Sequence, residues 1–444
     1  MGHRTFERGI HPSYYKELTS GKRVEPAALP RTVVIPLQQH AGTPCEPLVK
    51  KGESVLEGQK IGDVKAFVSA PVHASISGKV KDIELANHPN GLRCASVIIE
   101  GDGSAREWGA DNKGADIGTL QPEAVRQAIR EAGIVGMGGA AFPSSVKLSP
   151  PKGKAVDTVI LNGCECEPYL TADHRIMVEE PEKVVWGLKA LMKASGATKG
   201  FIGIEENKPD AIEALTGAVS GSPEIRIIVL EAKYPQGAEK MLISAAIGRK
   251  VPPGKLPFDV GVLVNNVGTA VAVFEALNWG KPLFERVVTI SGNGVKEPKN
   301  LKVRVGTMFE EVIAQCGGLA GKEIEVLNGG PMMGISQSTL AVPVTKGTTG
   351  ITVISADEIK VRPYEPCIKC ASCVEACPMG LMPYRLGDYG KLQMTAEFNA
   401  LDGLSCIECG CCSYVCPAKR PLIQWIRVGK LKLRQEARKA QGAK

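Results

Sequence analysis

Two runs of closely spaced cysteines near the C-terminal end of the chain have the residue type and the spacing to hold redox-active clusters. The first run consists of Cys367, Cys370, Cys373 and Cys377. The second run consists of Cys406, Cys409, Cys412 and Cys416. Each run has the pattern C-x2-C-x2-C-x3-C-P, which is typical of [4Fe–4S] clusters held by thiolates. This part of the chain is therefore expected to carry electrons.

In such a doubled run, the fourth cysteine of each run binds the cluster of the other run. We therefore expect cluster 1 to be held by Cys367, Cys370, Cys373 and Cys416. We expect cluster 2 to be held by Cys406, Cys409, Cys412 and Cys377. Paired C-x2-C motifs also suit zinc, but the doubling and the proline after each fourth cysteine favour iron–sulfur clusters. Cys411 falls outside the three-residue step and is not expected to be a ligand.

Length and composition indicate a folded chain of several domains. The 444 residues predict about three domains, and 43% hydrophobic with 23% charged residues suits ordinary packed cores. The remaining cysteines are scattered and form no disulfide framework. Cys164 and Cys166 form a C-x-C pair without further cysteine or histidine nearby, so we expect them to pack rather than to bind metal. Thiolate-held clusters favour a reducing compartment.

No segment is expected to span a membrane. The N-terminus lacks the apolar core of a signal peptide, and the most apolar long stretch, 258–277, is interrupted by four polar residues. The formal net charge of +7 comes from residues 417–444, where nine Lys or Arg accompany one acid. We expect this basic tail either to lie on an anionic membrane or acidic partner, or to pack as a last helix on the cluster domain.

The chain begins with an expected irregular arm, residues 1–30, followed by short β segments to residue 115. Residues 47–62 and 70–80 resemble the barrel-sandwich fold of biotinyl and lipoyl carrier domains. The hairpin that presents Met-Lys-Met in those carriers is replaced here by residues 63–66, Asp-Val-Lys-Ala. We therefore predict a structural or docking domain without a carrier lysine.

A glycine-rich loop follows a predicted helix at 121–132. Clustered glycines let several backbone N–H groups approach one anion, as phosphate-binding loops do. The loop lacks the G-x-G-x-x-G pattern and follows a helix, so it is no ordinary dinucleotide fingerprint. However, two buried strands, 157–161 and 261–264, end in polar clusters, and ligands of α/β folds lie at such strand ends. Together these features outline a nucleotide or flavin pocket.

These segments resemble the flavoprotein component of respiratory complex I, which binds FMN and NADH. The motifs of that flavoprotein are G-R-G-G-A-G-F-P-T-G-L-K, N-A-D-E-x-E-P, Y-x-C-G-E-E-T and V-N-N-V-E-T. With the carrier-like domain and the doubled cysteine run, the order of parts is similar to the RnfC family, whose members are subunits of Rnf complexes. The characteristic motifs of this family, N-G-x-E-C-E-P-Y-L and G-I-H-P, begin here at Asn162 and Gly9. The resemblance covers nearly the whole chain.

The resemblance implies the residues that contact FMN and NADH. The glycines that would cradle the FMN phosphate or lie along the isoalloxazine are Gly136, Gly138 and Gly139. The groups that would bind the ribityl and phosphate parts are Lys147, Asn162, Asn265, Asn266 and Thr269. The residues implied for NADH are Phe142, which would stack on adenine, Glu165 and Glu167. The second polar turn is matched by Gly237 and Glu239. The chain departs from the complex I pattern at Met137, Cys164 and Ala238.

We therefore expect a multidomain α/β and β protein. The predicted parts are the arm (1–30), the barrel-sandwich domain (31–115), a Rossmann-like α/β flavin domain (116–284), a soluble-ligand-binding β-grasp module (285–355), a helical two-[4Fe–4S] ferredoxin-like domain (356–420) and the basic amphipathic tail (421–444). We expect the β-grasp module to be a structural spacer.

The resemblance implies an NAD-linked electron-input subunit of a membrane-associated, ion-translocating ferredoxin:NAD oxidoreductase. Its cofactors would be FMN, two [4Fe–4S] clusters and NAD(H), and its partners would be other subunits of the complex and, indirectly, ferredoxin. It would lie peripherally on the cytoplasmic face of the inner membrane and bind no nucleic acid. Two alternatives stay open: the diaphorase subunit of a soluble bifurcating hydrogenase or dehydrogenase, and a non-catalytic iron–sulfur conduit with a degenerate flavin site.

Overall fold

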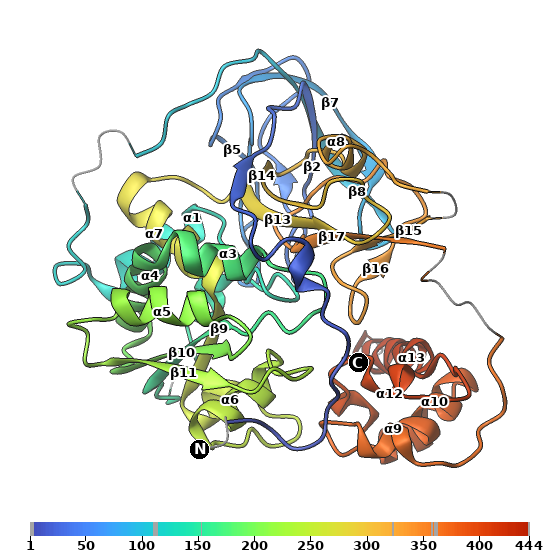
Figure 1. The fold of residues 1–444 in the computed structure, drawn as a ribbon. Coiled ribbons are helices and arrows are strands. Elements are labelled where there is room, and N and C mark those ends of the chain that lie inside the picture. The colour runs from blue at the N-terminus through green and yellow to red at the C-terminus, as the bar shows by residue number, and fades with distance from the viewer. Residues whose placement is uncertain are drawn as a thin grey trace.

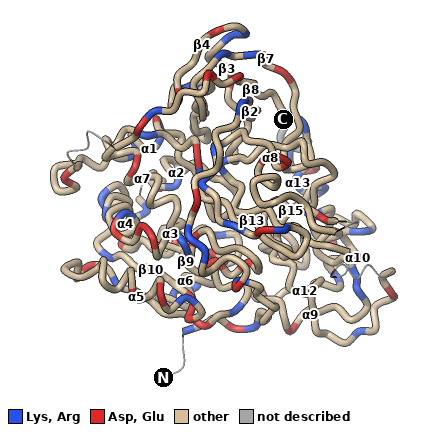
Figure 2. Tube along the Cα trace, turned by 45° about the horizontal axis from the view of Figure 1, so that its top comes forward, with Lys and Arg blue, Asp and Glu red and all other residues tan. Residues whose placement is uncertain are grey.

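A computed structural model describes residues 4–109, 114–151, 153–321, 324–356, 358 and 363–442. The N-terminal strands lie at the top of Figure 1, an α/β unit lies below them, and the C-terminal helices form a separate body at the lower right. Acidic and basic positions are interspersed along all of these parts in the view of Figure 2. The outer ends of the expected arm and tail, residues 1–3 and 443–444, lie outside the described residues.

The N-terminal β region consists of two small sheets packed around one core. The strands are β2 (Thr32–Pro36), β3 (Glu46–Pro47), β4 (Ser54–Val55), β5 (Lys60–Asp63), β6 (Val72–His73), β7 (Gly78–Asn87) and β8 (Arg93–Gly101). One sheet has the order β2-β8-β7-β4 and the other β3-β5-β6. Alternate residues of β2 and β8, such as Val33, Ile35, Val97 and Ile99, are fully buried between the sheets. This is the predicted barrel-sandwich arrangement.

The α/β unit contains a parallel four-stranded sheet of order β11-β10-β9-β12. The strands are β9 (Thr158–Gly163), β10 (Lys199–Glu205), β11 (Ile225–Leu230) and β12 (Val262–Asn266). The helices are α1 (Pro122–Glu131), α2 (Ser144–Lys147), α3 (Ala172–Glu179), α4 (Pro181–Ser195), α5 (Pro209–Ala218), α6 (Glu239–Ile247) and α7 (Val267–Trp279).

Both faces of this sheet are covered, because its apolar side chains alternate between two cores. Val159 and Leu161 pack with α1, α4 and α7, whereas Ile160 packs with α6 on the opposite face. Near-continuous apolar strands covered on both faces are characteristic of doubly wound folds. The predicted Rossmann-like architecture is confirmed in this respect.

A mixed six-stranded sheet of order β1-β14-β13-β17-β15-β16 follows. Its strands are β1 (Val24–Pro26), β13 (Glu285–Ser291), β14 (Lys299–Arg304), β15 (Ile324–Asn328), β16 (Ile335–Ser336) and β17 (Gly350–Ser355), and α8 (Phe309–Ala314) packs on it. The position of β1 differs from the prediction of an irregular arm, since residues 24–26 pair in parallel with β14. A three-residue strand carries too little periodicity to be predicted without its partner.

The cysteine runs lie in a helical body made of α9 (Ser372–Glu375), α10 (Pro383–Lys391), α11 (Thr395–Ala400), α12 (Cys411–Tyr414) and α13 (Leu422–Gly442). Single turns η1 (Lys16–Leu18), η2 (Pro257–Val260) and η3 (Gly403–Ser405) complete the elements. The first turns of α13 bury Leu422, Ile423 and Ile426 in this body. The first part of the tail is therefore a packed helix, while Leu431 is exposed.

Candidate functional site

The polar clusters after β9 and β12 meet at one edge of the parallel sheet. The two strands are neighbours, and Asn162 is the direct register partner of Asn266. The Asn162 amide donates to the Gly237 carbonyl at 2.8 Å, and its oxygen accepts from the Cys164 N–H at 3.1 Å. The turn before α6 is thereby joined to the end of β9. Three of the sequence-predicted segments thus converge at the carboxyl ends of the strands, where α/β folds bind ligands.

Asn265 and Asn266 have different environments at the end of β12. The Asn266 oxygen caps α7 by accepting from Gly268 N at 2.8 Å and from Thr269 N at 3.4 Å. Asn265 is only 5% exposed, and its amide nitrogen has no hydrogen-bond partner among the described residues. Because a buried donor without a partner costs free energy, the Asn265 amide suits a ligand acceptor such as a flavin oxygen.

The glycine loop lies directly over these strand ends. The Met137 N–H donates to the Thr269 hydroxyl at 3.0 Å. A Cβ on Gly138 would come within 2.9 Å of the Asn266 amide, whereas a Cβ on Gly139 would meet no protein atom within 4 Å. The Gly136 N–H donates to the Phe142 carbonyl at 2.9 Å. The loop is thus closely packed at residue 138 and open at residue 139, which forms a cradle that fits FMN.

Lys147 and Glu239 form an ion pair at one side of this cradle. The Lys147 ammonium lies 2.7 Å from a Glu239 carboxylate oxygen. Lys147 ends α2 and Glu239 begins α6, so the pair links the glycine loop to the second polar turn. Both side chains are part-exposed, and a bound phosphate would be free to compete for the ammonium.

The two glutamates expected on the NADH side accept hydrogen bonds from backbone groups. The Glu165 carboxylate accepts from Asp173 N at 2.8 Å and from His174 N at 3.1 Å, at the start of α3. The Glu167 carboxylate accepts from Met332 N at 2.5 Å and Met333 N at 3.0 Å. Burial raises the pKa of Glu167 to about 7. Both residues therefore organise the loops around the site.

Asp173 and Arg286 also belong to this region, although sequence reasoning did not single them out. The Asp173 carboxylate accepts from the Asn266 amide at 2.6 Å, and burial raises its pKa to about 7. Arg286, at the start of β13, donates to the Lys346 carbonyl and, at 3.4 Å, to the Met137 carbonyl. Burial lowers the pKa of Arg286 to about 10. The signal in the sequence was weak, because a charged residue at a strand end is normally exposed.

The cysteines of both runs lie in the helical body and influence one another's pKa. Burial raises the pKa of Cys373, and the charges of Cys416, Cys367 and Cys370 raise it further, so these four thiols are neighbours. Burial also raises the pKa of Cys412, with further contributions from Cys406, Cys409 and Cys377. Cys409, Cys412 and Cys377 raise the pKa of the buried Cys411 as well, so Cys411 belongs to the second group and the ligand sets of the two clusters stay predictions.

A small, partly open pocket lies beside the second group of cysteines. Its lining includes all four predicted ligands of cluster 2 together with Ile407 and Ile426. Within the described part of the chain, no three His, Cys, Asp or Glu side chains converge closely enough to hold a single metal ion. Thiolates hold both zinc and four-iron clusters, and it is the doubled spacing of the cysteines that favours the clusters.

The α/β unit and the cluster body are in direct contact. The Tyr234 hydroxyl donates to the Cys409 carbonyl at 2.8 Å. Arg8 and Gly9 of the N-terminal arm bond the carbonyls of Val374 and Ala376 beside the first cysteine run. The cluster body is therefore anchored both to the predicted flavin unit and to the N-terminal arm.

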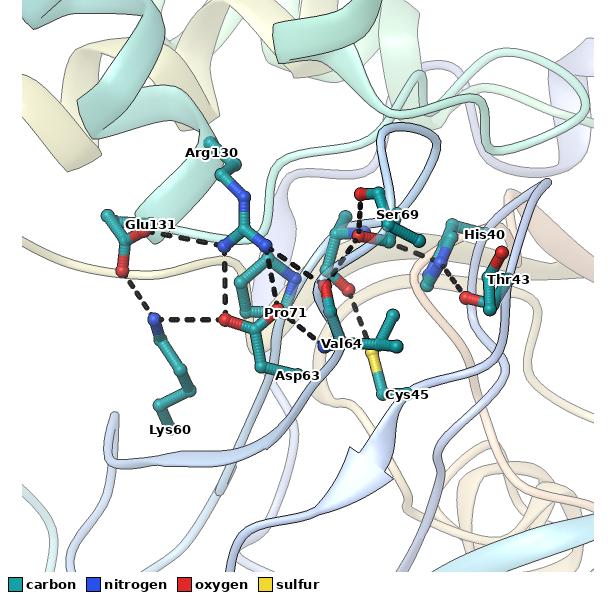
Figure 3. Close-up of polar contacts among 12 residues, drawn as sticks. His40, Thr43, Cys45, Lys60, Asp63, Val64, Ser69, Pro71, Arg130 and Glu131 are labelled. Carbon is teal, nitrogen blue, oxygen red and sulfur yellow. Dashed lines mark hydrogen bonds and ion pairs between the residues drawn. The ribbon is translucent and has the colours of Figure 1, made fainter.

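The hairpin at residues 63–66 is anchored to α1 (Figure 3). The Asp63 carboxylate accepts two hydrogen bonds from the Arg130 guanidinium at 2.8 and 3.0 Å, and Lys60 pairs with Glu131. Two oppositely charged pairs thus connect the end of β5 to the end of α1. This anchoring favours a docking role for the N-terminal domain over that of a swinging carrier.

Among the residues that the structure describes, we find no helix with both the length and the apolarity needed to span a bilayer.

Comparison with family models gives four matches along the chain. Residues 4–104 match the RnfC barrel sandwich hybrid domain, and residues 129–275 match the Nuo51 FMN-binding domain. Residues 287–336 match the SLBB domain, and residues 366–419 match the 4Fe-4S dicluster domain. The predicted order of folds and the predicted FMN and [4Fe–4S] cofactors are confirmed at the level of domains.

Two relatives match nearly the whole chain. The chain is 47% identical over 440 residues to the C subunit of the Na(+)-translocating ferredoxin:NAD(+) oxidoreductase complex of Acetobacterium woodii, covering 98% of this chain and 99% of that protein. It is 46% identical to the C subunit of the proton-translocating ferredoxin:NAD(+) oxidoreductase complex of Clostridium ljungdahlii. This match covers 96% of this chain and 93% of that protein. A solved NAD+-reducing [NiFe]-hydrogenase in the air-oxidized state shares the fold with a TM-score of 0.51 at 21% identity, over 70% of this chain and 63% of that chain.

Proposed function

The chain belongs to the RnfC family, whose members are subunits of ion-translocating ferredoxin:NAD oxidoreductase (Rnf) complexes, and from this premise we propose that it exchanges electrons between NAD(H) and the other subunits of such a complex. The observation that carries the proposal is the meeting of the glycine loop with two strand ends, where Met137 N is bonded to Thr269 and Gly138 packs on Asn266. The same chain holds the dicluster domain that such a flavin site requires as its one-electron outlet.

Bound FMN supplies the change between two-electron hydride exchange with nicotinamide and one-electron exchange with iron–sulfur clusters. In this proposal the protein positions and shields the flavin. The unpartnered Asn265 amide donates to it, and the open face of Gly139 lets it approach the backbone. Lys147, which pairs with Glu239 in this structure, would hold the flavin phosphate with its ammonium. Phe142, which is 38% exposed, is available to stack on the adenine of NADH.

The proposal includes a place for the protein in the cell and a set of partners. Ferredoxin would be reached indirectly through iron–sulfur subunits of the complex. The chain would lie peripherally on the cytoplasmic face of the membrane, held by other subunits. Support comes from the names of the relatives, which describe ion-translocating complexes that act on ferredoxin and NAD(+).

The test is to purify the chain anaerobically and to measure flavin content and NADH-driven dye reduction. We expect bound or reconstitutable FMN and NADH oxidation. The Cβ of Gly139→Val would meet no protein atom within 4 Å, so this variant is expected to fold, and its side chain in the open cradle should cause loss of flavin. Gly21→Val, where a Cβ also meets nothing, is the matched control and should retain flavin.

A second candidate function is a non-catalytic electron conduit, favoured by the departures at Met137, Cys164 and Ala238. Wild-type protein that binds no FMN and oxidises no NADH, while holding both clusters, would establish the conduit and refute our proposal. The diaphorase alternative is separated by co-purification, because only a subunit of a membrane complex should be recovered with membrane proteins. The hydrogenase likeness, at 21% identity, concerns the fold alone.

A further inference from the structure

The contact between the flavin unit and the cluster body is made beside one of the two cysteine groups. A small buried core at this boundary contains Ile10, Tyr234, Ala376, Cys409 and Cys411, with Cys166 and Met332 packed against it. Cys409 belongs to the predicted ligands of cluster 2. The boundary is therefore lined by a member of the cysteine group that borders the small pocket.

Tyr234 connects this boundary to the flavin side through a short path. Its side chain is 1% exposed, and its hydroxyl donates to the Cys409 carbonyl at 2.8 Å. Three residues later, Gly237 N donates to the Cys166 thiol at 3.3 Å, and Gly237 O accepts from Asn162. A single turn of chain thus touches both the predicted flavin ligand Asn162 and the predicted cluster ligand Cys409.

A second connection runs through the β-grasp sheet. Glu167, which follows β9, fixes the backbone of Met332 and Met333. The Met332 carbonyl in turn lies against Gly410, where a Cβ would approach it to 2.8 Å. Gly410 is the residue after Cys409, so the segment around cluster 2 is held from two directions by groups near the flavin site.

Cluster 1 has the opposite environment. Its predicted ligand Cys370 is exposed, and the neighbouring Ile368 is 66% exposed. The Cys370 thiol accepts from the Ser372 hydroxyl at 3.4 Å within the same run. Cys373 and Cys416 pack with Leu386 and Leu422 inside the helical body. This group therefore reaches solvent on the side where a partner protein can approach.

We propose that cluster 2, held by Cys406, Cys409, Cys412 and Cys377, is the flavin-proximal cluster, that Tyr234 positions it, and that cluster 1 is the outlet to the next subunit. This proposal rests on the proposed function. One hydride exchanged with NAD(H) carries two electrons and leaves one proton, and each cluster takes one electron at a time. The electrons leave singly from cluster 1 to an iron–sulfur acceptor, or enter there when flow is reversed.

The first experiment removes one cluster at a time in the full chain. Cys370→Ala is expected to lose cluster 1, and Cys406→Ala cluster 2, each with about four irons remaining of the eight that two cubes contain. With one equivalent of NADH, the cluster left in Cys370→Ala should become EPR-active. The cluster left in Cys406→Ala should stay oxidised with NADH, although the flavin bleaches, and should be reduced by dithionite. The reverse pattern would overturn the order.

Flavin bleaching separates this proposal from the proposed function. If NADH bleaches no flavin in wild-type protein, the proposed function fails. If it bleaches flavin but reduces the clusters in the reverse order, only the order fails.

A second measurement tests the assignment of cluster 2 as the flavin-proximal cluster if Cys406→Ala does not fold. Tyr234→Phe removes only the hydroxyl that donates to Cys409. A reduced cluster gains negative charge, which a nearby hydrogen-bond donor stabilises. Loss of this donor should therefore lower the midpoint potential of one of the two clusters in an EPR-monitored titration with dithionite. Cys370→Ser should move the other potential, and Tyr15→Phe, at a side chain that is 39% exposed, should move neither. The role of Tyr234 would be refuted if Tyr234→Phe and Cys370→Ser shifted the same midpoint potential. It would also be refuted if Tyr234→Phe shifted neither potential.

Discussion

Lys208 and Glu205 form an ion pair that is completely buried. The Lys208 ammonium lies 3.1 Å from a Glu205 oxygen, and neither side chain has any exposed surface. The same ammonium donates to the Cys164 carbonyl at 2.6 Å. The pair therefore ties the end of β10 to the polar segment that follows β9. Because charges deep in a protein need close partners, this arrangement fixes the backbone beneath the predicted flavin site.

We predict that Lys208→Met destabilises the protein by about 3–5 kcal/mol, since it removes the ion-pair partner of the buried Glu205 carboxylate. The double variant Lys208→Met/Glu205→Leu should recover most of that loss, because both charges are removed together. The measurement is the free energy of unfolding from anaerobic urea titration. A double variant as unstable as the single one would show that the pair itself is not what stabilises this region.

The buried Lys346 predicts a dependence of stability on alkaline pH. Its ammonium donates to the Pro71 and Gly133 carbonyls at 2.6 and 2.7 Å, and burial lowers its pKa to about 7. Between pH 7 and about 10.5 the unfolded chain binds this proton and the folded chain does not. Stability contributed by this group therefore rises with pH across that window, by at most about 1.4 kcal/mol per unit.

The check is to compare urea unfolding of wild-type protein and Lys346→Met at several pH values from 7 to 10. The variant should lose the Lys346 part of the slope, so that the difference between the two proteins changes with pH. Parallel curves would contradict the prediction.

Gly429 allows a close crossing of two helices in the cluster body. A Cβ there would lie 2.7 Å from the Phe398 ring and 3.0 Å from the Gly390 Cα. We predict that Gly429→Ala destabilises the cluster body by about 1–3 kcal/mol through overpacking, despite the better helix propensity of alanine. Gly217→Ala, in α5 with nothing within 4 Å, is the control and should be neutral or stabilising by about 0.5–1 kcal/mol. Thermal unfolding and iron content of both variants would test this.

Cys411 and Cys412 are adjacent in α12 and both are buried, but only Cys412 is predicted to be a ligand. We expect about eight irons per chain in wild-type protein and in Cys411→Ala, and about four in Cys412→Ala. Iron and acid-labile sulfide assays measure this. Loss of four irons from Cys411→Ala would show that the ligand set of cluster 2 is wrong.

The sequence predicted those features whose physical signal is local. The spacing of the eight cysteines is a property of consecutive residues, and the dicluster domain that it predicts is matched over residues 366–419. The helix at 121–132 and the strands at 157–161 and 261–264 appear as α1, β9 and β12. They were predictable because the pattern of apolar residues that marks each one lies within a short stretch of sequence.

The remaining features depend on residues distant in the chain, and only the tertiary structure decided them. Residues 24–26 become a strand because β14 offers an unpaired edge nearly 280 positions later. Asp173 accepts a hydrogen bond from Asn266, and Arg286 donates to the Met137 carbonyl in the glycine loop. No local sequence pattern reveals either contact. Most of all, the sequence determined that a flavin-type site and two clusters share one chain, whereas the bond from Tyr234 to Cys409 determined which cysteine group faces that site. Such contacts arise from packing between folded units, and short-range sequence patterns do not encode them.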